Sequence, residues 1–218
     1  MGIAHLFVWL KQNHIECVNT VLVSEPMAKH VSIDTLGLDL NGLFHPCCQK
    51  VFQYGKHEKR KSLLHPNRDS YPNPKTLYQK AFREIQRTID TIMTSVKPKK
   101  RLFLCVDGIA GLSKCKQQRG RRFRSERHAS GFDSNCITPG TDFMRQLNYS
   151  LEKYIQSSIV SNPLWAGLEI VFSSQAVPGE GEHKIIQLIR TRCDDSESTC
   201  IVGLDADLIM LGLSLQRK

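Results

Sequence analysis

Short apolar runs that alternate with helical segments are the feature that most limits the fold of this chain. Strands are expected in the run that begins at residue 31 and ends near Asp39, and in the runs 102–108, 168–172 and 199–204. Helices are expected at 75–96, 112–124 and 141–158, and again from residues 182 and 208. Strands and helices in alternation predict an α/β fold, with a mainly parallel twisted sheet flanked by helices.

Local signals refine this prediction. The chain has 218 residues, enough for one domain or for one and part of another. An apolar segment at residues 3–10 predicts a short helix packed on the core. Asn41-Gly42 predicts a turn after the first strand. Pro98 is expected to stop the helix that begins at 75, and Thr141 or Asp142 to cap the helix that follows.

Two glutamates lie between the buried strand expected at 168–172 and the helix expected from 182. Glu180 and Glu182 alternate with glycines that permit a tight backbone path. A helix N-terminus favours such carboxylates because its N–H groups carry partial positive charge. Helix-start chemistry alone would explain an isolated pair, but other acids occupy matching positions along the chain.

These acids all fall at or just beyond the carboxyl ends of expected strands: Asp39, Asp107, Glu180, Glu182, Asp205 and Asp207. In parallel sheets the ligand site is the crevice outside those ends. Carboxylates that converge there repel one another, and hard divalent cations such as Mg²⁺ or Mn²⁺ relieve that repulsion. The set predicts two metal ions and hydrolysis of a phosphodiester. For Asp205 and Asp207 taken alone, helix capping is the better interpretation.

The segment 112–124 is the most basic part of the chain. At about 100° per residue, one arc of the expected helix collects Lys114, Gln118, Arg121 and Arg122. Like charges gathered on one face cost stability unless an anion meets them. The pattern favours a phosphate-binding face over a merely solvated one.

Composition agrees with a polyanionic partner. The net charge is +9, with a pI of about 9.2, which favours nucleic acid but is weak evidence on its own. The 8 cysteines form no metal-ligand pair pattern and are expected to be free thiols in a reducing compartment. No apolar run is long enough to span a bilayer and no secretory signal is present, so an intracellular protein is expected, without distinction between nucleus and cytoplasm.

Residues 53–75 interrupt the pattern. Basic residues crowd into this segment and prolines follow them. We expect an exposed, disordered insertion, either solvated or in contact with nucleic acid.

Long motif-like runs make the chain resemble the XRN family of 5′→3′ exoribonucleases. They are LDLNG at 38–42, VDG at 106–108, QQRGRRFRS at 117–125, FDSNCITPGT at 132–141, PGEGEHK at 178–184 and GLDADLIML at 203–211. Lone Asp-x-Asp or Glu-x-Glu pairs are common, but these runs in this order are highly specific. The more distant flap-endonuclease and PIN-type nucleases share the acidic crevice but not the run at 118–122.

The resemblance implies a fold, an activity and a set of residue roles. It implies a PIN- and flap-nuclease-like domain over residues 1–218 that degrades single-stranded RNA with a 5′-monophosphate, with Mg²⁺ as cofactor and Mn²⁺ as a substitute. In the family pattern the acids above hold the metals and carry catalysis. Lys114, Gln118, Arg121 and Arg122 then bind the 5′-phosphate, and His45 stacks on the first base.

Alternatives to this function stay open. Family members continue into a second conserved segment, so the sheet is expected to be incomplete at its C-terminal end, and the activity of this length of chain alone is uncertain. One alternative is a structure-specific flap-type DNA nuclease. Another is a truncated homologue that binds RNA without turnover.

Overall fold

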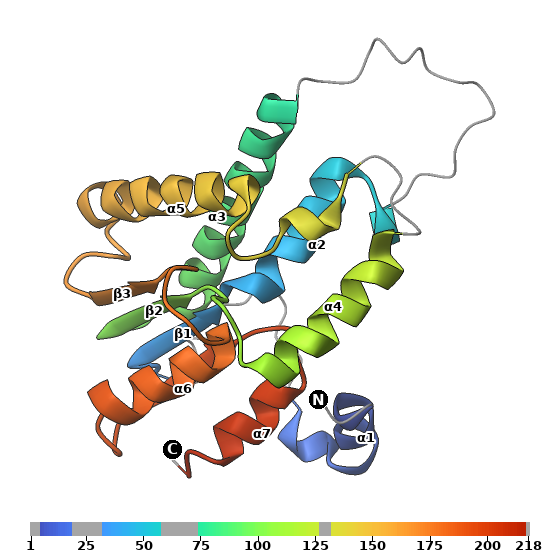
Figure 1. Cartoon of the computed structure of the whole chain (residues 1–218). Helices are drawn as coiled ribbons and strands as arrows, with labels where there is room; N and C mark the ends of the chain where they lie inside the picture. The colour runs from blue at the N-terminus through green and yellow to red at the C-terminus, as the bar shows by residue number, and fades with distance from the viewer. Residues whose placement is uncertain (1–4, 19–31, 58–73, 127–131, 217–218) are drawn as a thin grey trace.

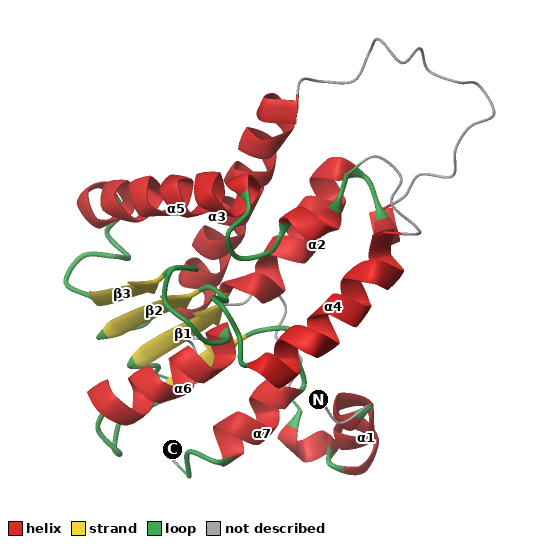
Figure 2. Cartoon of the chain, viewed as in Figure 1, coloured by secondary structure: helices red, strands yellow, loops and turns green. Residues whose placement is uncertain are grey.

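The computed structural model describes residues 5–18, 32–57, 74–126 and 132–216. Four parallel strands form one sheet in the order β3-β2-β1-β4. Figure 2 shows β1, β2 and β3 side by side. The strands are β1 (Thr35–Asp39), β2 (Arg101–Cys105), β3 (Glu169–Ser173) and β4 (Thr199–Val202). The prediction of an α/β fold with a parallel sheet is confirmed.

Helices cover both faces of the sheet (Figure 1). They are α1 (Leu6–Asn13), α2 (Leu40–Phe52), α3 (Pro74–Val96), α4 (Leu112–Glu126), α5 (Asp142–Ser161), α6 (Gly181–Arg192) and α7 (Asp207–Leu213), with 3₁₀ turns η1 (Ile15–Cys17), η3 (Gly55–His57) and η5 (Ser134–Cys136). Among the described residues, no helix has both the length and the apolar character needed to cross a membrane.

Alternation along the central strands divides the core into two parts. Leu36 and Leu38 of β1 are fully buried on the side of α2, α3 and α5. Phe103 of β2 packs on the other side, against Ile185 of α6. Gly37 is required there because a Cβ at this position would lie 2.6 Å from Ile185 Cγ2. Because Gly37 has no Cβ, α6 can lie close to the sheet. This position brings the start of α6 beside the strand ends.

The predicted helix boundaries are close to the observed ones. In α3 the residues Ala81, Ile85 and Ile89 are fully buried, as their spacing predicts. That helix ends at Val96. The next residue, Lys97, has a positive φ of 51° and precedes Pro98. Thr141 caps α5, since its hydroxyl accepts a hydrogen bond of 3.3 Å from the backbone N–H of Met144.

Three local predictions are wrong. The segment at Asn41-Gly42 is no turn, because α2 begins at Leu40, directly after β1. Gly42 instead allows a close approach, since a Cβ there would lie 3.2 Å from the backbone nitrogen of Leu204. The strand β3 is only half-buried, with Glu169 exposed, because it lies at an edge of the described sheet.

The third error concerns α1. The helix forms, but none of its described residues is buried, and Trp9 is 51% exposed. It therefore does not pack on the core as expected.

Two further expectations concern the cysteines and the basic insertion. All 8 cysteines lie within the described residues, where each carries a thiol and none is joined in a disulfide. Residues 58–73 of the basic insertion lie outside the described residues.

Candidate nuclease site

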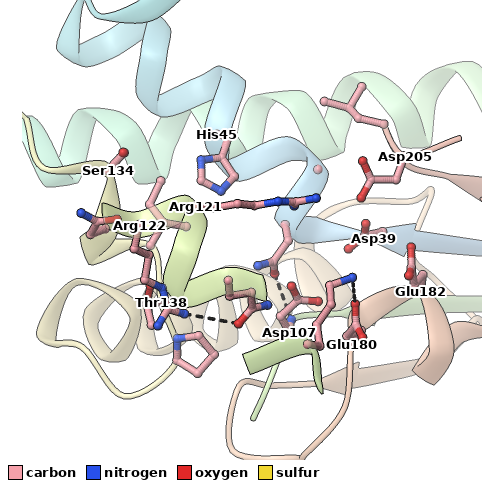
Figure 3. Close-up of a pocket in the computed structure, with 18 residues that line it drawn as sticks. Asp39, His45, Asp107, Arg121, Arg122, Ser134, Thr138, Glu180, Glu182 and Asp205 are labelled. Atoms are coloured by element: carbon pink, nitrogen blue, oxygen red, sulfur yellow. Dashed lines mark hydrogen bonds and ion pairs between the residues drawn. The ribbon is translucent and has the colours of Figure 1, made fainter. Parts of the chain in front are cut away.

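A cavity of about 410 Å³ opens beyond the carboxyl ends of β1 and β2 (Figure 3). Its lining comes from the first turns of α2, from α4, from the segment 134–139, and from the loops that precede α6 and α7. Parallel strands place their following loops at one edge of the sheet, and this explains why segments distant in sequence meet here.

One side of the cavity, the acidic wall, carries the carboxylates of Asp39, Asp107, Glu180, Glu182 and Asp205. The sequence placed all of these at strand ends, and the structure brings them together. Asp207, the remaining predicted ligand, does not line this cavity. It lies in the first turn of α7, whose N-cap is Ala206 and has no side-chain cap, so the alternative that Asp205 or Asp207 caps this helix is wrong.

Asp39 ends the central strand and is 7% exposed. Within the described residues its buried Oδ1 has no hydrogen-bond partner. Burial raises the pKa of Asp39 to about 7, and the nearby charges of Asp107, Glu182 and Asp205 add to the rise. A buried carboxylate oxygen without a partner is costly, so this atom is suited to a cation or a proton.

Two hydrogen bonds, each from a backbone N–H to a side-chain oxygen, hold Asp107 in place. Its own N–H donates to Asn41 Oδ1 at 2.9 Å, and its Oδ1 accepts a hydrogen bond of 2.6 Å from the N–H of Gly181. Burial raises the pKa of Asp107, while the Gly181 N–H opposes the rise. A Cβ at residue 181 would lie 2.7 Å from Asp39 Oδ1 and 3.4 Å from Asp107 Oδ1. Glycine at this helix start therefore lets both carboxylates approach one place.

The glutamates occupy the start of α6. Glu180 is its N-cap residue and forms an ion pair with Lys114 across the cavity. Glu182 is 8% exposed, and its pKa is raised by burial and by the charge of Glu180. Beneath them, the buried Lys184 donates to the carbonyl oxygens of Val106 at 2.7 Å and Ser174 at 3.1 Å.

Oxygen ligands from carboxylates fit Mg²⁺ or Mn²⁺ better than softer metals. The unpartnered Oδ1 of Asp39 is the atom that most favours such a cation. In the part of the chain that the structure describes, however, no three His, Cys, Asp or Glu side chains are grouped closely enough to hold a metal ion. Asp39, Asp107, Glu180, Glu182 and Asp205 are the residues that could do so after side-chain rotation.

The opposite side, the basic wall, is formed by Lys114, Gln118, Arg121 and Arg122 of α4. The helical spacing predicted this shared face, and all four residues line the cavity. Arg122 Nη2 donates to Gln118 Oε1 at 3.4 Å. Arg121 is exposed and extends across the cavity between His45 and the acidic wall (Figure 3). The basic wall can therefore offer several donors to one anion.

His45 also lines the cavity, one turn after Asn41 in α2. The residue is exposed to solvent. Desolvation by the surrounding protein atoms lowers the pKa of His45, and the charge of Asp205 partly opposes this decrease. A neutral ring facing the cavity can stack on a flat ligand.

Some lining residues had no predicted role. They are Asn41, Gly42, Leu204 and the residues Ser134, Asn135, Ile137, Thr138 and Pro139. The motif at 132–141 was a signal for the last group, but nothing in its spacing indicates that it faces α4. Lys184 was also missed, because a lysine in an amphipathic helix is normally assigned to the solvent face.

The fold and the cavity define a class: a PIN- and flap-nuclease-like α/β domain with an acidic crevice at its strand ends. The family model described as "XRN 5'-3' exonuclease N-terminus" matches residues 1–131 and 126–218. The chain belongs to this family.

Curated relatives agree with this assignment. The chain is 35% identical to 5'-3' exoribonuclease 1 of Homo sapiens over 98% of its own length and 13% of that protein. It is 34% identical to 5'-3' exoribonuclease 2 of Gallus gallus, over 98% of the chain and 26% of the relative. It is 36% identical to 5'-3' exoribonuclease 2 of Schizosaccharomyces pombe, over 88% of the chain and 21% of the relative. The chain thus spans between about an eighth and a quarter of the relatives it matches.

Proposed function

We propose that this chain is the 5′-end-binding and catalytic portion of a 5′→3′ exoribonuclease that acts on 5′-monophosphorylated single-stranded RNA. The observation that carries the proposal is the opposition of the acidic and basic walls across one cavity. A terminal phosphate on the basic wall would hold the first phosphodiester bond toward the carboxylates. The names of the relatives support RNA as substrate.

Each wall has a distinct role in this proposal. Arg121, Arg122, Gln118 and Lys114 bind and orient the terminal phosphate, and the His45 ring stacks on the first base. The acidic wall holds two Mg²⁺ ions, for which Mn²⁺ can substitute. When bound, these ions would supply an activated water and stabilise the leaving oxygen. Asn41 and Gly181 keep Asp107 in place, so that this carboxylate is positioned before substrate binds.

The test is digestion of RNAs that differ only at the 5′ end. The chain is incubated with 5′-monophosphate, 5′-triphosphate and 5′-hydroxyl RNAs, with Mg²⁺ or with excess EDTA, beside the Asp39→Asn variant. Mononucleotide release from the 5′-monophosphate RNA alone, only with Mg²⁺ and only by the unchanged chain, supports the proposal. Unchanged cleavage in EDTA contradicts it, and a preference for branched DNA would instead identify a flap-type nuclease.

A second candidate function is RNA binding without turnover. Lys114 forms an ion pair with Glu180, so one carboxylate of the acidic wall already has a cationic partner. Mg²⁺-dependent binding of 5′-monophosphate RNA with no product over long incubation would identify this function.

A further inference from the structure

The ion pair between Lys114 and Glu180 connects the two walls of the cavity. Lys114 belongs to the basic wall and lies in the first turn of α4, whereas Glu180 belongs to the acidic wall and is the N-cap residue of α6, without a side-chain capping hydrogen bond. The side chains are 24% and 18% exposed, so solvent screens their attraction only in part. A residue assigned to the phosphate is therefore paired with a residue assigned to the metal.

We propose that Lys114 exchanges Glu180 for the terminal phosphate, so that binding of the RNA end and binding of the divalent cation favour each other. The inference rests on the proposed function, since it assigns the anion to the basic wall and the cation to the acidic wall. It goes further, because it makes one side chain the connection between two sites.

The physical argument begins with the cation. A divalent ion at the acidic wall needs the oxygens of Glu180 and is repelled by an ammonium group that touches them. While Lys114 is paired with Glu180, the acidic wall has one carboxylate fewer to bind the cation. It also carries one additional positive charge that repels the cation. Binding of the cation must therefore displace Lys114.

The phosphate supplies an alternative partner for the displaced group. Gln118, Arg121 and Arg122 lie on the same face of α4 as Lys114, so an anion bound to them lies within reach of its side chain. A phosphate dianion attracts the ammonium group at least as strongly as one carboxylate does. Its binding releases Glu180 for the cation. By linkage, the cation then strengthens phosphate binding by the same factor.

The experiment measures Mn²⁺ binding to the whole chain by isothermal titration, with saturating adenosine 5′-monophosphate or with adenosine. Neither compound has a phosphodiester bond to cleave, so the readout is independent of nuclease activity. For the unchanged chain we expect Mn²⁺ to bind about tenfold tighter with the monophosphate, within the usual range of coupling. For Lys114→Met we expect tighter Mn²⁺ binding without phosphate and a phosphate effect below about threefold.

Two matched variants control the result. Lys116→Met removes an exposed charge from the same helix that does not line the cavity, and it should behave as the unchanged chain. Lys114→Arg keeps the charge and should retain most of the coupling. If Lys114→Met does not fold, as judged by circular dichroism, Lys114→Gln takes its place in the comparison.

The outcomes separate this inference from the proposed function. Mn²⁺ binding that is unaffected by phosphate, or a full phosphate effect in Lys114→Met, overturns the exchange while leaving the metal site intact. An unchanged or weaker Mn²⁺ affinity of Lys114→Met without phosphate also overturns it. A failure of the unchanged chain to bind Mn²⁺ under either condition overturns both the inference and the metal part of the proposed function.

Discussion

Asn41 Oδ1 accepts a hydrogen bond of 2.9 Å from the backbone N–H of Asp107. This contact joins the first turn of α2 to the residue that follows β2 by two positions, across neighbouring strands. It fixes the backbone from which the Asp107 carboxylate projects, and it explains why a polar residue follows the central strand so closely.

Asn41→Ala should lower the free energy of unfolding by about 1–3 kcal/mol, because the partly buried N–H of Asp107 loses its partner. Urea denaturation measures this change. Gln187→Ala, on the exposed face of α6, should change stability by less than about 0.5 kcal/mol and serves as control. Equal effects of both variants would show that the Asn41 contact is not stabilising.

The pKa of Asp39, raised to about 7 from an ordinary value of 3.8, predicts a pH dependence of stability. Between these values the folded chain keeps a proton that the unfolded chain has lost, so stability falls as pH rises from about 4 through 7. The part due to Asp39 is on the order of 2–4 kcal/mol. Asp107 and Glu182 act in the same direction, whereas His45, with its lowered pKa, opposes it.

Asp39→Asn removes this titration, so the variant should lose less stability than the unchanged chain between pH 5 and pH 8. Urea unfolding at both pH values checks the difference. Ion-paired carboxylates such as Glu197 have lowered pKa values, and they lose their contribution only below this range. Parallel pH profiles of the two proteins would contradict the assignment.

The sequence predicted the acidic wall well because its residues follow from topology. Once strands alternate with helices, Asp39 and Asp107 must lie at the same edge of a parallel sheet. The face of α4 follows equally from helical spacing. The first argument needs only the order of strands and helices along the chain. The second needs only the number of residues per helical turn.

Other features depend on contacts between distant segments and could not be predicted in that way. How α4, α6 and α7 pack sets the ion pair of Lys114 with Glu180, the burial of Lys184 and the position of Asp207 outside the cavity lining. The error at Asn41 has the same origin. Its side chain bonds Asp107 instead of forming a local turn, and Gly42 makes room for the backbone at Leu204.

Gly181→Ala should destabilise the acidic wall, because the added Cβ would lie 2.7 Å from Asp39 Oδ1 and 3.2 Å from the carbonyl oxygen of Cys105. Overpacking of this kind costs about 1–3 kcal/mol. Gly212→Ala is the matched control within a helix, since a Cβ there meets no atom of the described residues within 4 Å. This change should be neutral or stabilising. Thermal denaturation measures the melting temperatures of both variants. Equal melting temperatures would contradict the close approach of Gly181 to Asp39 and Cys105.

Divalent cations should stabilise the chain through the acidic wall. At a concentration one hundred times the dissociation constant, Mn²⁺ should add about 2.7 kcal/mol to the free energy of unfolding. Asp39→Asn should remove most of this gain, whereas Asp194→Asn, in the exposed loop before β4, should keep it. A gain retained in Asp39→Asn would mean that the ion binds elsewhere.

Arg121→Ala should weaken recognition of a 5′-phosphate while leaving the fold unchanged, because the side chain is exposed and extends into the cavity. A charge-assisted hydrogen bond contributes about 1.5–3 kcal/mol, so affinity for a 5′-monophosphate oligonucleotide should fall roughly ten- to a hundredfold. Affinity for the 5′-hydroxyl form should hardly change. Arg119→Ala is the control, since Arg119 lies 5.7 Å from the centre of the Phe123 ring and does not line the cavity. Fluorescence anisotropy measures the affinities of the unchanged chain and of both variants for the two labelled oligonucleotides. An equal loss on both oligonucleotides would make Arg121 a general backbone contact and move end recognition to the other residues of the basic wall.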